Sequence, residues 1–290
     1  MENQNQDIKL IECPRDAMQG LKEFINTKDK IRYINQLLKV GYDTIDFGSF
    51  VSPKAIPQMR DTSEVLKGLD VSHTNTKLSA IVANIRGATE ACKYEQIDYL
   101  GYPFSISETF QMRNTNATIE ESFSRILEIH KLAKDHDKEI LLYISMAFGN
   151  PYGDLWNGEI CKFWIDRLAE VGINLFALSD TIGVASSQSV SYLFDHLVES
   201  YPELEFGAHF HTRPNEWQEK IEAAYENGCR RFDSALRGYG GCPMAKDDLT
   251  GNMPTENLYA YFTKIGAKTG IKSDEFHKSM AMAEEIFPPV

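Results

Sequence analysis

The stretch from Asn174 to Leu236 decides the fold. It contains, in order, NLFALSD (174–180), SSQSVSYLFDHLVESYP (186–202), EFGAHFH (205–211), NEWQEKIEAAYENG (215–228) and RRFDSAL (230–236). The first, third and fifth segments are short apolar runs typical of interior strands, whereas the two between them carry the apolar spacing of amphipathic helices. Strands therefore alternate with helices, which is the pattern of a parallel sheet with helical crossovers.

The same alternation extends upstream and downstream. Five more strand-like runs are LIECP (10–14), DTIDFGS (43–49), LSAIVA (78–83), IDYLGYPF (97–104) and EILLYISMAF (139–148). Thr118 and Glu121 form a capping box at one helix start, and Gly172 is placed as a helix C-cap. Eight strand–helix units without a linker predict one α/β domain over residues 1–290. We expect a (β/α)8 TIM barrel over about 8–271 and an extra C-terminal helix over about 272–290.

A doubly wound open sheet is the alternative architecture. It would carry a glycine-rich phosphate-binding turn after the first strand. The sequence has CPRDAMQG (13–20) there instead, which favours the barrel.

Composition narrows the classes of function. Apolar residues make up 42% and charged residues 25% of the chain, as in globular proteins. The formal charge of −12 opposes binding to nucleic acid or anionic membranes. No membrane span or targeting segment is visible, and five cysteines without regular spacing favour reduced thiols. We expect a cytoplasmic protein in which Cys13, Cys92, Cys161 and Cys229 serve in packing.

Polar residues collect at the carboxyl ends of the predicted strands, which is where barrel enzymes carry their catalytic groups. These residues are Arg15, Asp16, Asp46, Ser49, Ser145, Asp180, Thr181, His209, His211, Cys242 in a glycine-rich loop, and Asn252.

His209 and His211 stand two positions apart in a strand and should therefore face the same side. They are either metal ligands or buried packing residues that need hydrogen-bond partners. Two nitrogens do not complete a metal site, and Asp16 and Asn252 lie on neighbouring strands of a closed barrel. This donor set suits Mn²⁺ or Zn²⁺ and tolerates Mg²⁺.

Three other residues have two interpretations each. Arg15 either forms a surface ion pair with Asp16 or points into the pocket, where it could hold a carboxylate or stabilise an enolate oxygen. Asp180 is a candidate base or a cap for the following helix. Cys242 is either an acid–base group on a flexible loop or a small buried apolar residue.

The sequence resembles the 3-hydroxy-3-methylglutaryl-CoA lyases from about Lys9 to Leu258. The matching segments are PRDAMQ (14–19), SFVSPKAIPQM (49–59), TIEESF (118–123), LSDTIGV (178–184), HFH (209–211), GYGGCP (238–243) and GNMPTEN (251–257). The resemblance implies metal-dependent retro-Claisen cleavage of an acyl-CoA to acetyl-CoA and acetoacetate, as in leucine degradation. It also implies a homodimer.

The resemblance assigns roles residue by residue. It implies that Asp16, His209, His211 and Asn252 hold the metal, that Arg15 stabilises the enolate, and that Cys242 transfers a proton. It further implies that Asp180 and Asp46 are catalytic. We expect Arg15, Gln19, Ser49 and Ser145 to contact the substrate.

The chain departs from the family pattern in three places. Asp46 stands where the family usually has a glutamate, and TRPNEW (212–217) follows the histidine pair. The interval from Cys242 to Asn252 is slightly longer than usual and has KDDLT (246–250) in place of the usual small residues. These changes keep two alternatives open. One is a lyase or condensing enzyme for a related 3-hydroxy-acyl-CoA or a 2-oxo acid, and the other is a non-catalytic paralogue that binds metal and ligand.

Overall fold

The computed structural model describes residues 7–241 and 250–288. Eight parallel strands pair in chain order, and β8 returns to β1, so the sheet closes into a barrel. The predicted TIM barrel is thereby confirmed. The strands are β1 (Lys9–Glu12), β2 (Thr44–Ser49), β3 (Lys77–Ile81), β4 (Tyr99–Ser105), β5 (Glu139–Ser145), β6 (Leu175–Asp180), β7 (Glu205–Thr212) and β8 (Arg231–Ser234).

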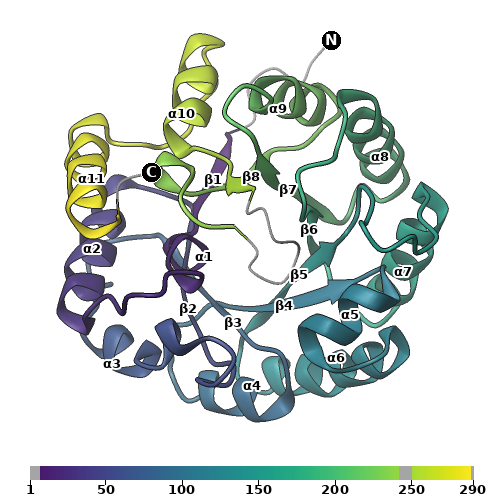
Figure 1. The fold of residues 1–290 in the computed structure, drawn as a ribbon, viewed down its shortest axis with the longest axis horizontal. Helices are drawn as coiled ribbons and strands as arrows, with labels where there is room; N and C mark the ends of the chain where they lie inside the picture. The colour runs from purple at the N-terminus through teal and green to yellow at the C-terminus, as the bar shows by residue number, and fades with distance from the viewer. Residues whose placement is uncertain (1–6, 242–249, 289–290) are drawn as a thin grey trace.

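A ring of helices surrounds the barrel (Figure 1). These helices are α2 (Thr27–Val40), α3 (Thr62–Lys67), α4 (Ile85–Ala91), α6 (Ile119–Lys134), α7 (Gly158–Glu170), α8 (Ser187–Ser200), α9 (Trp217–Glu226) and α10 (Thr255–Lys264). The predicted capping box at Thr118 is present at the start of α6. None of the described helices combines the length and the apolar character that crossing a membrane requires.

The expected C-terminal helix is also present, as α11 (Ser273–Ile286). It lies against α2, where Gln36 donates a hydrogen bond to the main-chain oxygen of Glu275 at 3.1 Å. The sequence patterns did not predict several short elements. They are α1 (Pro14–Gln19), α5 (Glu108–Thr115), the two 3₁₀ turns η1 (Pro57–Met59) and η2 (Leu236–Gly238), and β9 (Gly251–Asn252).

Strand alternation separates the barrel interior from the layer beneath the helices. On β5, Leu141 and Tyr143 belong to a small apolar cluster inside the barrel, whereas Ile140 and Leu142 join the large core under the helices. On β7 a glycine at the inward position 207 makes room for Arg231, because a Cβ there would lie 3.0 Å from the arginine side chain. The inward positions that follow it on β7 are the two histidines.

Candidate active site

The two histidines lie on one face of β7, as the sequence predicts. The ring centroids of His209 and His211 are 5.4 Å apart at an interplanar angle of 72°. The intervening Phe210 faces the helices, where it packs against Phe148 and Phe194. Both imidazoles are buried, so each needs a partner for its nitrogens.

Asp16 reaches the histidines from α1, the short helix that follows β1. Pro14 occupies the first helical position, where its missing N–H costs nothing. This early helix start turns Asp16 over the barrel mouth. One candidate ligand atom from each of Asp16, His209 and His211 lies within 4.8 Å of the others.

Asn252 comes to the same place by sheet pairing. Its strand, β9, runs antiparallel to β7, and Asn252 is the register partner of His211. The Asn252 amide nitrogen donates to the Tyr239 oxygen at 2.8 Å, which directs the amide oxygen elsewhere. The Asn252 amide is close enough to contribute to lowering the pKa of Asp16. The structure thus brings together the four residues predicted to bind metal.

The atoms left unpaired in this group fit a divalent cation. Asp16 Oδ1 accepts hydrogen bonds from Arg15 and Gln19, whereas Oδ2 is buried without a partner among the described residues. In each histidine Nδ1 already has a hydrogen-bond partner. Nδ1 of His209 lies 3.0 Å from Asp233 Oδ2, and Nδ1 of His211 lies 3.2 Å from the Thr250 oxygen. The remaining atoms are one carboxylate oxygen and two imidazole nitrogens, a donor set common at catalytic metals.

The charge states of Asp16 and His211 suit the same interpretation. For His209, burial lowers the pKa, but Asp233 outweighs the effect of burial and raises the pKa above its usual value. Burial raises the pKa of Asp16, but Arg15 and the two histidines outweigh burial and bring the pKa below its usual value. Asp16 is therefore ionised at neutral pH. Burial also lowers the pKa of His211, which favours the neutral imidazole that a metal requires.

Arg15 is held between two carboxylates. Its Nη1 donates to Asp16 Oδ1 at 2.8 Å, and its Nε and Nη2 both donate to Asp46 Oδ2, Nε at 2.9 Å. The Arg15 and Asp16 side chains are only 8% and 5% exposed, so this pair is not the surface ion pair that was one interpretation of the sequence. Burial raises the pKa of Asp46 to about 6, although Arg15 opposes that rise.

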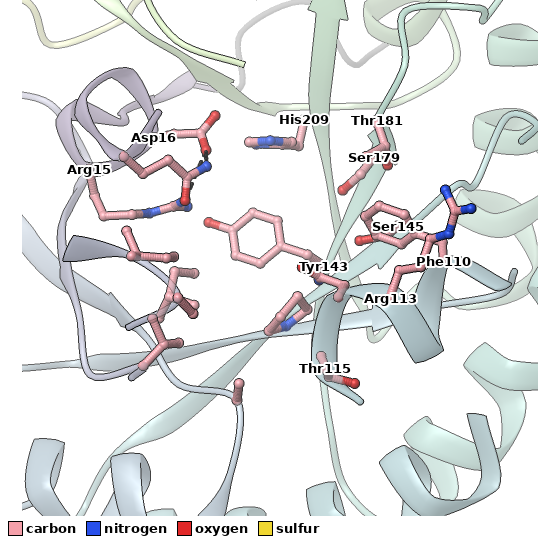
Figure 2. Close-up of a pocket in the computed structure, with 18 of the residues that line it drawn as sticks. Arg15, Asp16, Phe110, Arg113, Thr115, Tyr143, Ser145, Ser179, Thr181 and His209 are labelled. Atoms are coloured by element: carbon pink, nitrogen blue, oxygen red, sulfur yellow. Dashed lines mark hydrogen bonds and ion pairs between the residues drawn. The ribbon is translucent and has the colours of Figure 1, made fainter. Parts of the chain in front are cut away.

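Arg15, Asp16, His209 and His211 line a cavity of about 470 Å³. Figure 2 shows Arg15 and Asp16 on one side and Ser145, Ser179, Thr181 and Arg113 on the other, with the Tyr143 and His209 rings between them. Gln19 and Ser145, two of the predicted substrate contacts, line this cavity. Apolar side chains also line the cavity, among them Val51, Ala55, Ile56 and Phe110.

Among the described residues, four predicted site residues do not line the cavity: Asp46, Ser49, Asp180 and Asn252. The Ser49 side chain is buried, with Oγ 3.4 Å from the Ile81 oxygen, and Ser49 borders a separate depression. Asp180 faces the loop that follows β6, where it accepts hydrogen bonds from the Val184 and Ala185 amides at 2.8 and 3.0 Å and from Lys220 Nζ at 2.7 Å. Cys242 lies outside the described residues.

Sequence reasoning missed two buried groups beside the histidines. Tyr143 lies two positions before Ser145, so the alternation of β5 could have indicated it. Its ring meets that of His209 edge to face with centroids 5.2 Å apart, and its hydroxyl is buried without a partner among the described residues. Asp233 is the register partner of His209 on β8, a pairing that becomes visible only when the barrel register is known.

Comparison with known proteins agrees with this site. The HMGL-like family model matches residues 8–282. A protein of Pseudomonas aeruginosa named 3-hydroxy-3-isohexenylglutaryl-CoA/hydroxy-methylglutaryl-CoA lyase is 33% identical over 267 residues, covering 91% of this chain and 87% of the relative. A hydroxymethylglutaryl-CoA lyase of Bacillus subtilis is 32% identical over 273 residues, covering 94% and 90%.

Solved structures give the same result. An HMG-CoA lyase of Bacillus subtilis superposes with a TM-score of 0.91 at 30% identity, covering 98% of this chain and 95% of that one. An HMG-CoA lyase of Acinetobacter baumannii, in complex with coenzyme A and 3-methylmalate, gives a TM-score of 0.89 at 31% identity, covering 96% and 90%. The architecture is thus that of the TIM-barrel lyases. The chain belongs to the HMGL-like family, which confirms the resemblance inferred from the motifs.

Proposed function

We propose that the protein cleaves 3-hydroxy-3-methylglutaryl-CoA to acetyl-CoA and acetoacetate with the help of a divalent metal. The observation that carries this proposal is the convergence of Asp16, His209 and His211 ligand atoms within 4.8 Å of one another beside the buried Arg15. Asp16, His209, His211 and Asn252 would hold Mg²⁺ or Mn²⁺, and the donor set also accepts Zn²⁺. When bound, such a cation supplies a positive charge that lowers the pKa of a substrate hydroxyl.

The chain's own residues account for the charge that develops during cleavage. In this proposal the Cys242 thiolate takes the proton of the tertiary hydroxyl, the C–O bond becomes a ketone carbonyl, and the electron pair of the broken C–C bond passes to the acetyl unit as a thioester enolate. Arg15 donates hydrogen bonds to the enolate oxygen, and a preorganised donor of this kind is worth about 3–4 kcal/mol of barrier. We assign the proton that the enolate carbon then takes up to Cys242.

The two other candidate carboxylates, Asp46 and Asp180, lie outside the cavity lining and hold other parts of the site in place. Asp46, fully buried on β2, holds the Arg15 guanidinium through two hydrogen bonds. Asp180 fixes the loop after β6, and its partner Lys220 also reaches the His211 main-chain oxygen at 3.3 Å. We therefore infer that Asp46 orients Arg15 and that Asp180 acts on the site through the loop and β7.

A related substrate is the second candidate. The apolar side chains that line the cavity, Val51, Ala55, Ile56 and Phe110, suit a larger group at carbon 3 than methyl. The Pseudomonas relative is named for a substrate with an isohexenyl group at that carbon. A 3-hydroxy-3-alkylglutaryl-CoA with a longer branch would place that branch against these apolar side chains.

The two candidates are separated by a product assay. The protein is stripped of metal, reloaded with Mg²⁺ or Mn²⁺, and given 3-hydroxy-3-methylglutaryl-CoA or its longer-branched analogue. The thioester product and the oxo acid are then quantified, with Phe110→Trp as a variant that narrows the cavity. Faster cleavage of the methyl substrate supports the first candidate, whereas faster cleavage of the longer substrate, reduced by Phe110→Trp, supports the second. A 2-oxo acid is tested in the same way. If neither acyl-CoA nor the 2-oxo acid is turned over, the protein is a binding paralogue.

We further propose a cytoplasmic homodimer that acts in leucine degradation. The family resemblance supports this setting. Several vertebrate relatives are named cytoplasmic, and others are named mitochondrial. Light scattering on the purified chain measures its mass in solution, and a monomeric mass of 32.9 kDa would contradict the dimer.

A further inference from the structure

Asp233 contacts the imidazole of His209 from inside the barrel. The two residues are register partners on the adjacent strands β8 and β7. Asp233 Oδ2 lies 3.0 Å from His209 Nδ1, and the Asp233 side chain is 1% exposed. The corresponding nitrogen of His211 faces the main-chain oxygen of Thr250 instead. His209 therefore depends on a carboxylate side chain for its orientation, whereas His211 depends on the backbone.

We propose that Asp233 is a positioning residue that fixes the tautomer of His209. A neutral imidazole carries one N–H, and the partner of one nitrogen decides which nitrogen has the free lone pair. An ionised carboxylate can only accept a hydrogen bond. With Asp233 beside it, Nδ1 of His209 carries the proton and Nε2 is left bare toward Asp16 and His211. The inference rests on the metal site of the proposed function.

Substitution by asparagine reverses the polarity of this contact with little change in shape. An amide group can donate an N–H to Nδ1, which stabilises the tautomer that carries the proton on Nε2. Such an imidazole has no lone pair to offer at the metal position. We therefore expect Asp233→Asn to be more damaging to metal binding than loss of one hydrogen bond would suggest.

A second arrangement of the same residues is the competing interpretation. Cys13, His209 and Asp233 also place ligand atoms within 4.8 Å of one another. In that arrangement Asp233 and the Cys13 thiolate would themselves bind a cation. Co²⁺ distinguishes the two, because a bound thiolate gives a charge-transfer absorption band and an N/O site does not.

The test reads the tautomer directly. Metal-free protein labelled with ¹⁵N-histidine is studied at alkaline pH by long-range ¹H–¹⁵N correlation, with His209→Gln used to assign the signal. Mn²⁺ affinity is then measured by electron paramagnetic resonance. Wild type should show a protonated Nδ1, and Asp233→Asn should show a protonated Nε2 and bind Mn²⁺ about 10–100-fold more weakly. Asp43→Asn, at the opposite end of the barrel, should change neither.

Several results would overturn the proposal. A wild-type spectrum with a bare Nδ1 would do so without any variant, even if Asp233→Asn fails to fold. So would Mn²⁺ affinity that stays within threefold of wild type in Asp233→Asn, or a cobalt–thiolate band that disappears in Cys13→Ala. None of these readouts requires turnover. A protein with the expected tautomer and Mn²⁺ affinity that cleaves no substrate would contradict the proposed function alone.

Discussion

Arg15 and Asp46 are joined by two hydrogen bonds that end on the same carboxylate oxygen, one from Nε at 2.9 Å and one from Nη2. This contact fixes the plane of the guanidinium, and Asp16 holds its third side. A preorganised cation stabilises developing negative charge without having to reorganise during the reaction.

Arg15→Gln should therefore lower kcat by about 10²–10³, since one preorganised donor is lost. Mn²⁺ affinity should change much less, because Arg15 contributes no metal ligand. Steady-state kinetics and Mn²⁺ titration on the same preparation give both values. A kcat within tenfold of wild type would remove Arg15 from the mechanism.

Lys220→Met should destabilise the fold, because Asp180 would then keep a buried charge without its cation. The Lys220 and Asp180 side chains are 4% and 1% exposed, and breaking such a pair typically costs about 3–5 kcal/mol. Urea denaturation measures the free energy of unfolding. Adding Asp180→Asn to Lys220→Met should recover part of the loss. If the free energy of unfolding lost in the double variant equals the sum of the losses in the two single variants, the two side chains are not coupled.

Glu12 should make stability depend on pH. Burial raises its pKa from 4.5 to about 8, although hydrogen bonds from Thr255 and the Leu236 amide oppose that rise. Between these two values the folded protein keeps a proton that the unfolded chain loses. The contribution of Glu12 to the free energy of unfolding is complete below the lower value and decreases as pH rises, by at most about 1.4 kcal/mol per pH unit.

Glu12→Gln removes this titration. Urea denaturation across that pH window should give a flatter pH dependence for the variant than for wild type. Equal slopes in the two proteins would show that Glu12 titrates normally in the folded state.

Arg113→Ala should raise the KM for an acyl-CoA and leave kcat nearly unchanged. Arg113 borders the cavity from α5, with its guanidinium 4.7 Å from the centre of the Tyr152 ring. A hydrogen bond to a charged phosphate is worth about 1.5–3 kcal/mol, so the KM should rise by about tenfold or more. Lys93→Ala is the control, because Lys93 follows α4 and pairs with Glu90 of that helix, away from the cavity. If the KM is equal in Arg113→Ala and Lys93→Ala, the phosphates of the acyl-CoA bind elsewhere.

Local periodicity was enough to predict the barrel, the shared face of the two histidines and the C-terminal helix. Each of these depends on spacing within one segment. Contacts between distant segments were not visible in the same way. The partnership of Asp180 with Lys220 spans 40 residues, and that of Asp233 with His209 depends on the register between two strands. Ser49 lies at the end of a strand, as expected, yet its side chain turns toward Ile81 rather than the cavity.

The central claim is tested most directly by measuring bound Mn²⁺ and released acetoacetate together as metal is titrated into stripped protein. The substrate is 3-hydroxy-3-methylglutaryl-CoA, His211→Ala is the site variant, and His196→Ala, on α8, is the matched control. We predict that product release by the wild type and by His196→Ala rises in proportion to bound metal and that His211→Ala loses both. Equal release by the metal-free wild type, or full metal-dependent release by His211→Ala, would contradict the account.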